Sequence, residues 1–181
     1  LKHCGNNDFA NRVVKLMQTN YNFKDIFLTS SCTTALEMGA LLADLKVGDE
    51  VILPSYTFSS TANAVVLRGA KPVFCEISQE TMNIDANKIE GLITDKTKMI
   101  VPIDYAGIPC EINKIMELAT KYNLIVLQDT AQSFHSFHKD SFAPTLTNTN
   151  LHLHPFLVGR LSPQFYPVLK HLIKLYALLN H

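Results

Sequence analysis

Short apolar runs alternate with longer stretches of helical spacing through residue 127 of the chain. The apolar runs predict short strands at residues 25–28, 50–53, 72–77, 98–103 and 124–127. Apolar residues at helical spacing predict helices at residues 33–45, 60–68, 85–93 and 111–122. Two residues mark helix bounds: Gly69 ends the helix at residues 60–68, and Asp85 caps the start of the helix at residues 85–93.

The order of these elements favours an α/β fold. The run at residues 125–127 is continuously apolar, which is typical of a strand buried on both faces of a parallel sheet. Strands that alternate with helices predict right-handed crossovers and a layered domain. In such sheets, ligands bind where strands end and helices begin.

The pattern changes near residue 140. All 16 acidic residues lie at or before Asp140, and only three basic residues follow it. Residues 1–140 hold 13 basic and 16 acidic side chains, a net charge of −3, and residues 141–181 have a net charge of +3. In this tail, residues 168–179 have the spacing of a helix. The change predicts a boundary between two segments of different character.

The composition excludes several classes of partner. With 16 basic and 16 acidic residues the chain is neutral, which argues against nucleic acid or an anionic membrane as partner. No run of about 18 apolar residues appears, so we expect no membrane span.

Leu1 stands where a methionine would be expected, which predicts that the natural start lies upstream. No signal peptide or C-x-x-C pair is present, so we expect reduced thiols in a cytoplasmic protein at Cys4, Cys32, Cys75 and Cys110.

A candidate anion site lies at residues 30–36, between a predicted strand and a predicted helix. The unpaired amides and the dipole at a helix N-terminus can bind phosphate without a glycine-rich loop. Ser31 or Thr33 could instead be an ordinary N-cap. From this segment alone, the N-cap is the better interpretation.

Asp129 follows an apolar strand directly, on the side where a parallel sheet presents ligands. A carboxylate there can keep a pyridinium nitrogen protonated, so that the ring accepts electrons from a carbanion. Gln132, three residues further on, lies on the same side if this turn is helical. An equally good interpretation is that Asp129 caps a following helix.

An aromatic residue and a group of histidines are further candidates. Phe58, between a predicted strand and a predicted helix, could stack on a flat heterocycle, although a core position is commoner for phenylalanine.

Four histidines have spacings that suit a metal, namely His135, His138, His152 and His154. No cysteine or acidic residue completes a metal site there, so surface histidines are the better interpretation. No G-x-G-x-x-G follows a predicted strand, which argues against a nicotinamide-dependent enzyme.

The motifs of residues 1–139 resemble one family, the DegT/DnrJ/EryC1/StrS sugar aminotransferases. The matching segments are residues 31–38, 48–58, 61–64, 67–71, 81–85, 105–107 and 129–132. Their order and spacing make the match specific. Within the family, the motifs most resemble enzymes that act on dTDP-linked 4-keto-6-deoxy sugars in the synthesis of bacterial surface polysaccharides.

The resemblance implies an α/β fold with the three-layer, mostly parallel sheet of the aspartate-aminotransferase-like large domain, incomplete in this chain. It also implies a homodimer, pyridoxal 5'-phosphate (PLP) as cofactor, glutamate as amino donor and a nucleotide-linked sugar as acceptor. By match of motif, Cys32 and Thr33 hold the PLP phosphate and Phe58 stacks on the ring. Asp129 pairs with the ring nitrogen, and Gln132 contacts the ring hydroxyl.

The chain departs from the family pattern in three places. Members usually have histidine at Asp104, and glutamate and alanine at Gln128 and Thr130. The family's Ser-Phe-His-x-Thr-Lys-Asn segment, which carries the Schiff-base lysine, does not appear in residues 140–181. We therefore predict that residues 1–139 are part of the PLP-binding large domain, followed by a divergent, poorly ordered tail from a frameshift or a disrupted gene. Such a chain would be inactive, and the alternative is a non-catalytic module that binds a phosphate-bearing ligand or a partner protein.

Overall fold

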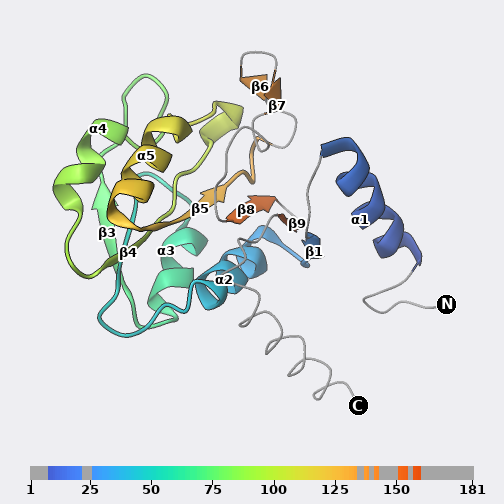
Figure 1. The fold of residues 1–181 in the computed structure, drawn as a ribbon, viewed down its shortest axis with the longest axis horizontal. Coiled ribbons are helices and arrows are strands. Elements are labelled where there is room, and N and C mark those ends of the chain that lie inside the picture. The colour runs from blue at the N-terminus through green and yellow to red at the C-terminus, as the bar shows by residue number, and fades with distance from the viewer. Residues whose placement is uncertain are drawn as a thin grey trace.

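The computed structural model describes residues 8–21 and 26–133, and the backbone of short strands at residues 137–138, 141–142, 151–154 and 157–159. In these residues the α-helices are α1 (Asp8–Tyr21), α2 (Cys32–Leu42), α3 (Ser59–Val66), α4 (Ala86–Ile89) and α5 (Ile112–Tyr122) (Figure 1). Two 3-10 turns are η1 (Glu90–Leu92) and η2 (Tyr105–Gly107). The strands are β1 (Ile26–Leu28), β2 (Glu50–Pro54), β3 (Lys71–Cys75), β4 (Thr97–Ile100), β5 (Ile125–Asp129), β6 (Phe137–His138), β7 (Ser141–Phe142), β8 (Leu151–His154) and β9 (Leu157–Gly159).

Seven of the described strands form one sheet, in the order β1-β9-β8-β5-β4-β2-β3. Strands β3, β2, β4, β5 and β8 run parallel to one another. Strand β9 is antiparallel to both β8 and β1, and β6 and β7 form a separate antiparallel pair. The mostly parallel sheet confirms the predicted α/β fold class.

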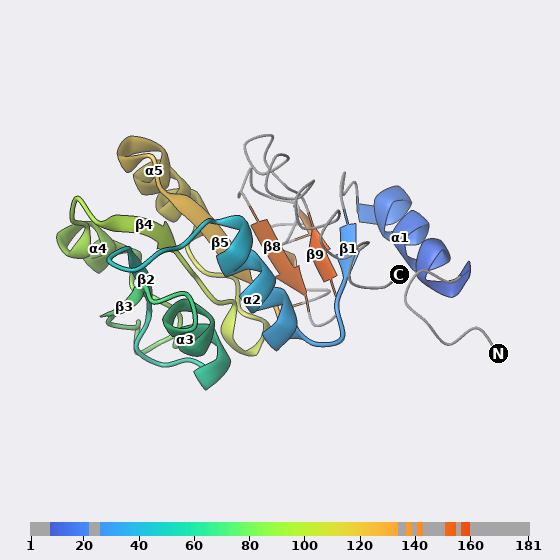
Figure 2. The ribbon, with the colours of Figure 1, turned by 90° about the horizontal axis from the view of Figure 1, so that it is seen from below.

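Helices cover both faces of the sheet. Helices α2 and α3 lie on one face, and α4 and α5 lie on the other (Figure 2). Neighbouring residues on a strand point to opposite faces of the sheet. Leu53 and Leu127 pack with α2 and α3. Ile52 and Val126 pack with α4 and α5. All four side chains are at most 1% exposed. The continuous apolar runs are therefore strands buried between two helical layers, as predicted.

The predicted helix at residues 85–93 is wrong in its second half. Asp85 caps α4 as predicted, because its carboxylate accepts a hydrogen bond from Asn87 N at 3.0 Å. However, α4 ends at Ile89, and η1 follows. Gly91 lies in η1, and its low helix propensity favours the change to a tighter turn.

The tail contributes to the sheet through β8 and β9, which lie beside β5. The sequence had not predicted these two strands. The predicted helix at residues 168–179 lies outside the described residues. The boundary at residue 140 and the origin of the tail stay predictions.

Gly69 follows α3 in a backbone conformation that glycine adopts more easily than other residues. Its φ is +73°, and an added Cβ would lie 2.6 Å from Cγ2 of Val47. We expect Gly69→Ala to lower the free energy of unfolding, measured by urea denaturation, by about 1–2 kcal/mol. Gly91→Ala is the control, because a Cβ at Gly91 meets nothing within 4 Å. Equal stability of the two variants would contradict this prediction.

Candidate functional site

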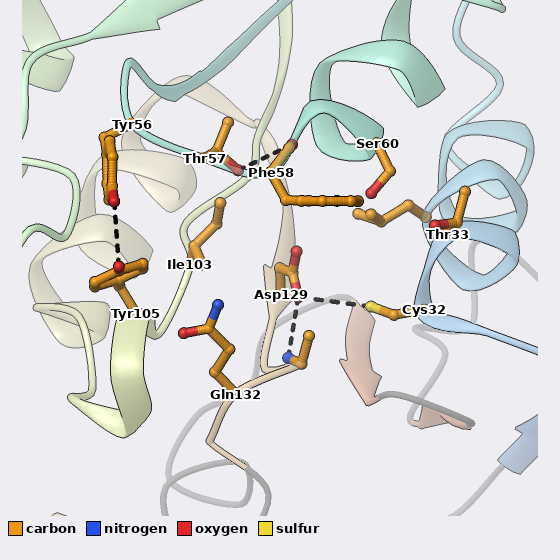
Figure 3. Close-up of a pocket in the computed structure, with 12 residues that line it drawn as sticks. Cys32, Thr33, Tyr56, Thr57, Phe58, Ser60, Ile103, Tyr105, Asp129 and Gln132 are labelled. Atoms are coloured by element: carbon orange, nitrogen blue, oxygen red, sulfur yellow. Dashed lines mark hydrogen bonds between the residues drawn. The ribbon is translucent and has the colours of Figure 1, made fainter.

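A cavity of about 400 Å³ opens at the carboxyl ends of β2, β4 and β5, beside the N-termini of α2 and α3 (Figure 3). Its lining comes from the segments that follow these strands and from the start of α2, namely Cys32, Thr33, Leu36, Tyr56, Thr57, Phe58, Ser60, Ile103, Tyr105, Asp129, Ala131 and Gln132. The structure thus brings all five predicted site residues, Cys32, Thr33, Phe58, Asp129 and Gln132, to one cavity. Parallel sheets present their ligands at this edge.

The N-terminus of α2 forms one wall of the cavity. Ser31 is the N-cap, because its backbone is extended and its hydroxyl accepts a hydrogen bond from Thr34 N at 3.2 Å. The N-cap interpretation is thus confirmed for Ser31. An N-cap and an anion site are compatible, since the first amides of a helix have no intrahelical acceptor and carry the positive end of the dipole. Cys32 and Thr33 supply those amides and line the cavity.

Asp129 ends β5 and reaches the cavity, although the residue is only 6% exposed. Its Oδ1 accepts hydrogen bonds from Ala131 N at 3.0 Å and from Cys32 Sγ at 3.7 Å. The Thr61 hydroxyl donates to the same carboxylate. Burial raises the pKa of Asp129, and the negative charge of Asp104 raises it further. No ion pair in the described residues involves Asp129, so this buried carboxylate favours a cation from outside the described residues.

A turn, rather than a helix, follows Asp129 in the described residues, so the helix-cap interpretation is wrong. Gln132 nevertheless lines the cavity. Its Oε1 accepts a hydrogen bond from Ala106 N at 2.7 Å. Ala106 lies in η2 and has a left-handed φ of +52°. The bond fixes the amide so that Nε2 is the group left to donate into the cavity.

Phe58 is 74% exposed, so the expectation of a core phenylalanine is wrong. It lies just before α3 and lines the cavity across from Gln132 (Figure 3). The neighbouring Thr57 Oγ1 donates to Thr61 Oγ1 at 3.0 Å. This bond ties the segment that carries Phe58 to the residue that contacts Asp129. An exposed ring at the edge of a cavity offers a flat apolar face to a ligand.

Two tyrosines that the sequence had not singled out form another part of the wall. The hydroxyls of Tyr56 and Tyr105 are 3.2 Å apart, and their ring centroids are 5.2 Å apart in an edge-to-face arrangement (Figure 3). Asn83 Oδ1 accepts from Tyr105 N at 2.8 Å and so holds the start of η2. The sequence signals for the two tyrosines are their positions shortly after a strand and within the family-motif segments at residues 48–58 and 105–107.

The thiol of Cys32 is held protonated. Burial, followed by the charge and hydrogen bond of Asp129, raises the pKa of Cys32 to about 12. Because a free cysteine has a pKa near 8.5, we expect Cys32 to react with iodoacetamide roughly a thousandfold more slowly at about pH 8. Mass spectrometry of the digested protein measures this rate, with the urea-unfolded chain as control. Labelling of native Cys32 at the unfolded rate would contradict the buried, hydrogen-bonded thiol.

Neither a metal cluster nor a membrane helix is found in the described part of the chain. No group of three or more His, Cys, Asp or Glu side chains there could hold a metal ion. The side chains of His135, His138, His152 and His154 lie outside the described residues, so a metal site at these histidines is not tested. In the same part of the chain, no helix is long and apolar enough to cross a membrane.

Comparison with known proteins places the chain in a family. Residues 6–150 match the DegT/DnrJ/EryC1/StrS aminotransferase family, and the chain belongs to it. This match runs into the predicted tail, and the position of the boundary stays a prediction.

Among curated relatives, GDP-perosamine synthase of Caulobacter vibrioides is 42% identical over 101 residues, which are 56% of this chain and 27% of that protein. Spore coat polysaccharide biosynthesis protein SpsC of Bacillus subtilis is 39% identical over 116 residues, 64% of this chain and 30% of that protein. Among solved structures, NtdA from Bacillus subtilis with bound cofactor PMP is 28% identical. Its TM-score is 0.76, and the match covers 88% of this chain and 38% of that one. This chain therefore spans less than a third of the length of these two curated relatives.

Proposed function

We propose that this chain forms the PLP-binding part of a sugar aminotransferase. The observation that carries the proposal is Asp129, a buried carboxylate without a cation among the described residues, facing a cavity that the N-terminus of α2 also lines. A phosphorylated pyridine offers the two complementary groups, an anionic phosphate and a protonated ring nitrogen. A volume of about 400 Å³ lies within the range of small-molecule sites. The residues present therefore fit the cofactor.

The family match and the geometry support one role for each of the five residues. Cys32 and Thr33, at the positive end of α2, would hold the phosphate. Asp129 would bind the ring nitrogen, and Nε2 of Gln132 would donate to the ring hydroxyl. Phe58 would stack on the face of the ring.

PLP, when bound, supplies an electron sink for a carbanion at the amino-acid carbon. Asp129 serves this chemistry by holding a proton on the ring nitrogen, since its negative charge stabilises the protonated form. The Thr61 hydroxyl and the Cys32 thiol donate to this carboxylate and keep it aimed into the cavity. Because the pKa of Cys32 is about 12, the thiol acts as a hydrogen-bond donor and not as a nucleophile.

We also propose glutamate as amino donor and a nucleotide-linked 4-keto-6-deoxy sugar as acceptor. The motifs resemble those of dTDP-4-amino-4,6-dideoxygalactose transaminase, which would place the product in a surface polysaccharide such as enterobacterial common antigen. The names of two relatives, GDP-perosamine synthase and a spore coat polysaccharide biosynthesis protein, support a sugar substrate. The resemblance further supports a cytoplasmic homodimer.

The 181 residues alone are proposed to catalyse little or no transamination. Residues 140–181 contain no Ser-Phe-His-x-Thr-Lys-Asn segment. Lys139 precedes the place expected for the Schiff-base lysine, and Lys170 and Lys174 lie in an unrelated context. The chain therefore lacks a lysine in the family's position for anchoring the cofactor and moving a proton. Turnover with glutamate by the purified chain would contradict this part of the proposal. A non-catalytic module that binds a phosphate-bearing ligand or a partner protein is the alternative.

Titration of the purified chain with pyridoxamine 5'-phosphate (PMP) tests the proposed cofactor site. PMP carries the same ring and phosphate as PLP, but it cannot form an imine with surface lysines. We expect saturable binding by calorimetry, and much weaker binding of pyridoxamine, which lacks the phosphate that α2 would hold. Inorganic phosphate should compete with PMP. Absence of saturable PMP binding would contradict the proposal. Equal affinities for pyridoxamine and PMP would contradict only the part that assigns the phosphate to the N-terminus of α2.

A further inference from the structure

Asp104 provides a second buried carboxylate behind Asp129. The residue is 0% exposed. Its oxygens accept hydrogen bonds from Cys110 N at 3.1 Å, from Gln128 Nε2 at 3.2 and 3.1 Å, and from Ser133 Oγ at 2.9 Å. None of the ion pairs in the described residues involves Asp104. A carboxylate that accepts from three residues in this way links them as one network.

Two of these donors flank the residues that face the cavity. Gln128 directly precedes Asp129, and Ser133 directly follows Gln132. Because side chains alternate along a strand, Gln128 points to the α5 face of the sheet and Asp129 points to the α2 face. The backbone adds a direct link, since Asp104 N donates to Asp129 O at 3.1 Å. The segment that carries Asp129 and Gln132 is therefore tied at both ends to one carboxylate.

We infer that Asp104 is a positioning residue of the proposed cofactor site, which acts on the bound ring through Asp129 and Gln132. The inference rests on the proposed function, because it concerns how that site holds its ligand. Asp104 itself does not line the cavity. Burying its charge costs free energy that a purely apolar contact would not. What the carboxylate provides in return is a fixed geometry for the two side chains that meet the ligand.

The charge of Asp104 also affects the proton affinity of Asp129. Two titratable groups act on Asp129, the Cys32 thiol from α2 and the Asp104 carboxylate from the segment after β4. The titratable group that acts on Asp104 is the Cys110 thiol, which donates a hydrogen bond to it. Because the charge of Asp104 raises the pKa of Asp129, its removal should lower that pKa. The acid limb of PMP binding, where Asp129 becomes protonated, should then move to lower pH.

The test is titration of the full chain with PMP from about pH 4 to about pH 8. Asp104→Asn keeps the shape of the side chain and removes its charge. We expect an affinity about tenfold lower at neutral pH, from the weakened network, and an acid limb at lower pH. The double variant Asp104→Asn with Gln128→Glu exchanges the two groups, so that a carboxylate at residue 128 faces an amide at residue 104. The PMP affinity and the pH of the acid limb should then both return part of the way to the values of the unchanged chain. The control is Asp85→Asn, an N-cap outside the cavity, which should change neither.

Wild-type affinity together with an unshifted acid limb in Asp104→Asn would overturn the inference. If that variant does not fold, Ser133→Ala removes a single donor, and unchanged PMP affinity there would overturn the inference as well. Full-strength PMP binding by Asp129→Asn would instead overturn the proposed function, and the inference with it. Loss of binding in Asp129→Asn but not in the Asp104 variants defeats the inference alone.

Discussion

Asp129→Asn is expected to bind PMP about 10- to 100-fold more weakly than the unchanged chain, while the protein resists denaturant better. Asparagine keeps the shape of the side chain but loses the charge that a protonated ring nitrogen needs. Hydrogen bonds to charged groups contribute about 1.5–3 kcal/mol, which sets the size of the loss. The same substitution removes a buried charge that opposes folding when no cation is bound.

The stability gain should depend on pH. Because burial raises the pKa of Asp129, the folded chain binds this proton more tightly than the unfolded chain does. Without ligand, the contribution of Asp129 to stability should therefore fall as the pH rises from about 4, the unfolded pKa, through the higher folded pKa. Burial raises the pKa of Asp104 as well, so Asp104 contributes in the same direction. Asp129→Asn removes the contribution of Asp129, so the gain in stability over the unchanged chain should grow as the pH rises through this range.

Urea denaturation at several pH values, with PMP titration of the same samples, measures both effects. The control is Asp49→Asn, because Asp49 Oδ2 accepts from Lys46 N at 2.8 Å just before β2, away from the cavity. This variant should bind PMP normally. If Asp129→Asn were less stable than the unchanged chain and bound PMP at full strength, both expectations would fail.

Leu127→Ala is expected to lower the free energy of unfolding by about 3–5 kcal/mol. Leu127 is 1% exposed and packs in the core that α2 and α3 cover, where an added Cβ on Gly39 would lie 2.9 Å from its methyl carbons. Its truncation leaves a void under α2, and most domains are stable by only about 5–15 kcal/mol.

Equilibrium urea denaturation measures the loss at Leu127. Leu67→Ala is the matched control, because Leu67 is 68% exposed and its truncation should change stability by no more than about 0.5 kcal/mol. A similar loss of unfolding free energy in the two variants would contradict the tight packing of Leu127 in the core.

The sequence predicted the parallel sheet because β2 and β5 are apolar at consecutive positions. Such runs leave no polar face, so they indicate burial on both sides. The same logic located the site, since Asp129 and Phe58 each follow a strand at the edge where parallel sheets bind ligands. The family motifs then narrowed the choice among the residues at that edge.

Other features depend on contacts that no local pattern encodes. The hydrogen bonds between Asp104 and Gln128, and between Tyr56 and Tyr105, require that the strands be placed in their final order. Helix α1 was not predicted, although it has apolar residues at helical spacing. Those side chains are largely exposed, so their spacing is not coupled to burial in the core.

The contact between Cys32 and Asp129 joins residues 97 positions apart and has a kinetic consequence. The start of α2 is synthesised early, but the Asp129 carboxylate cannot face it until β5 has docked in the sheet. Contacts of such long range form late, because a large loop must close first. A small molecule that spans both walls would recognise only chains that have completed this step, and by mass action it would draw the rest of the population toward them.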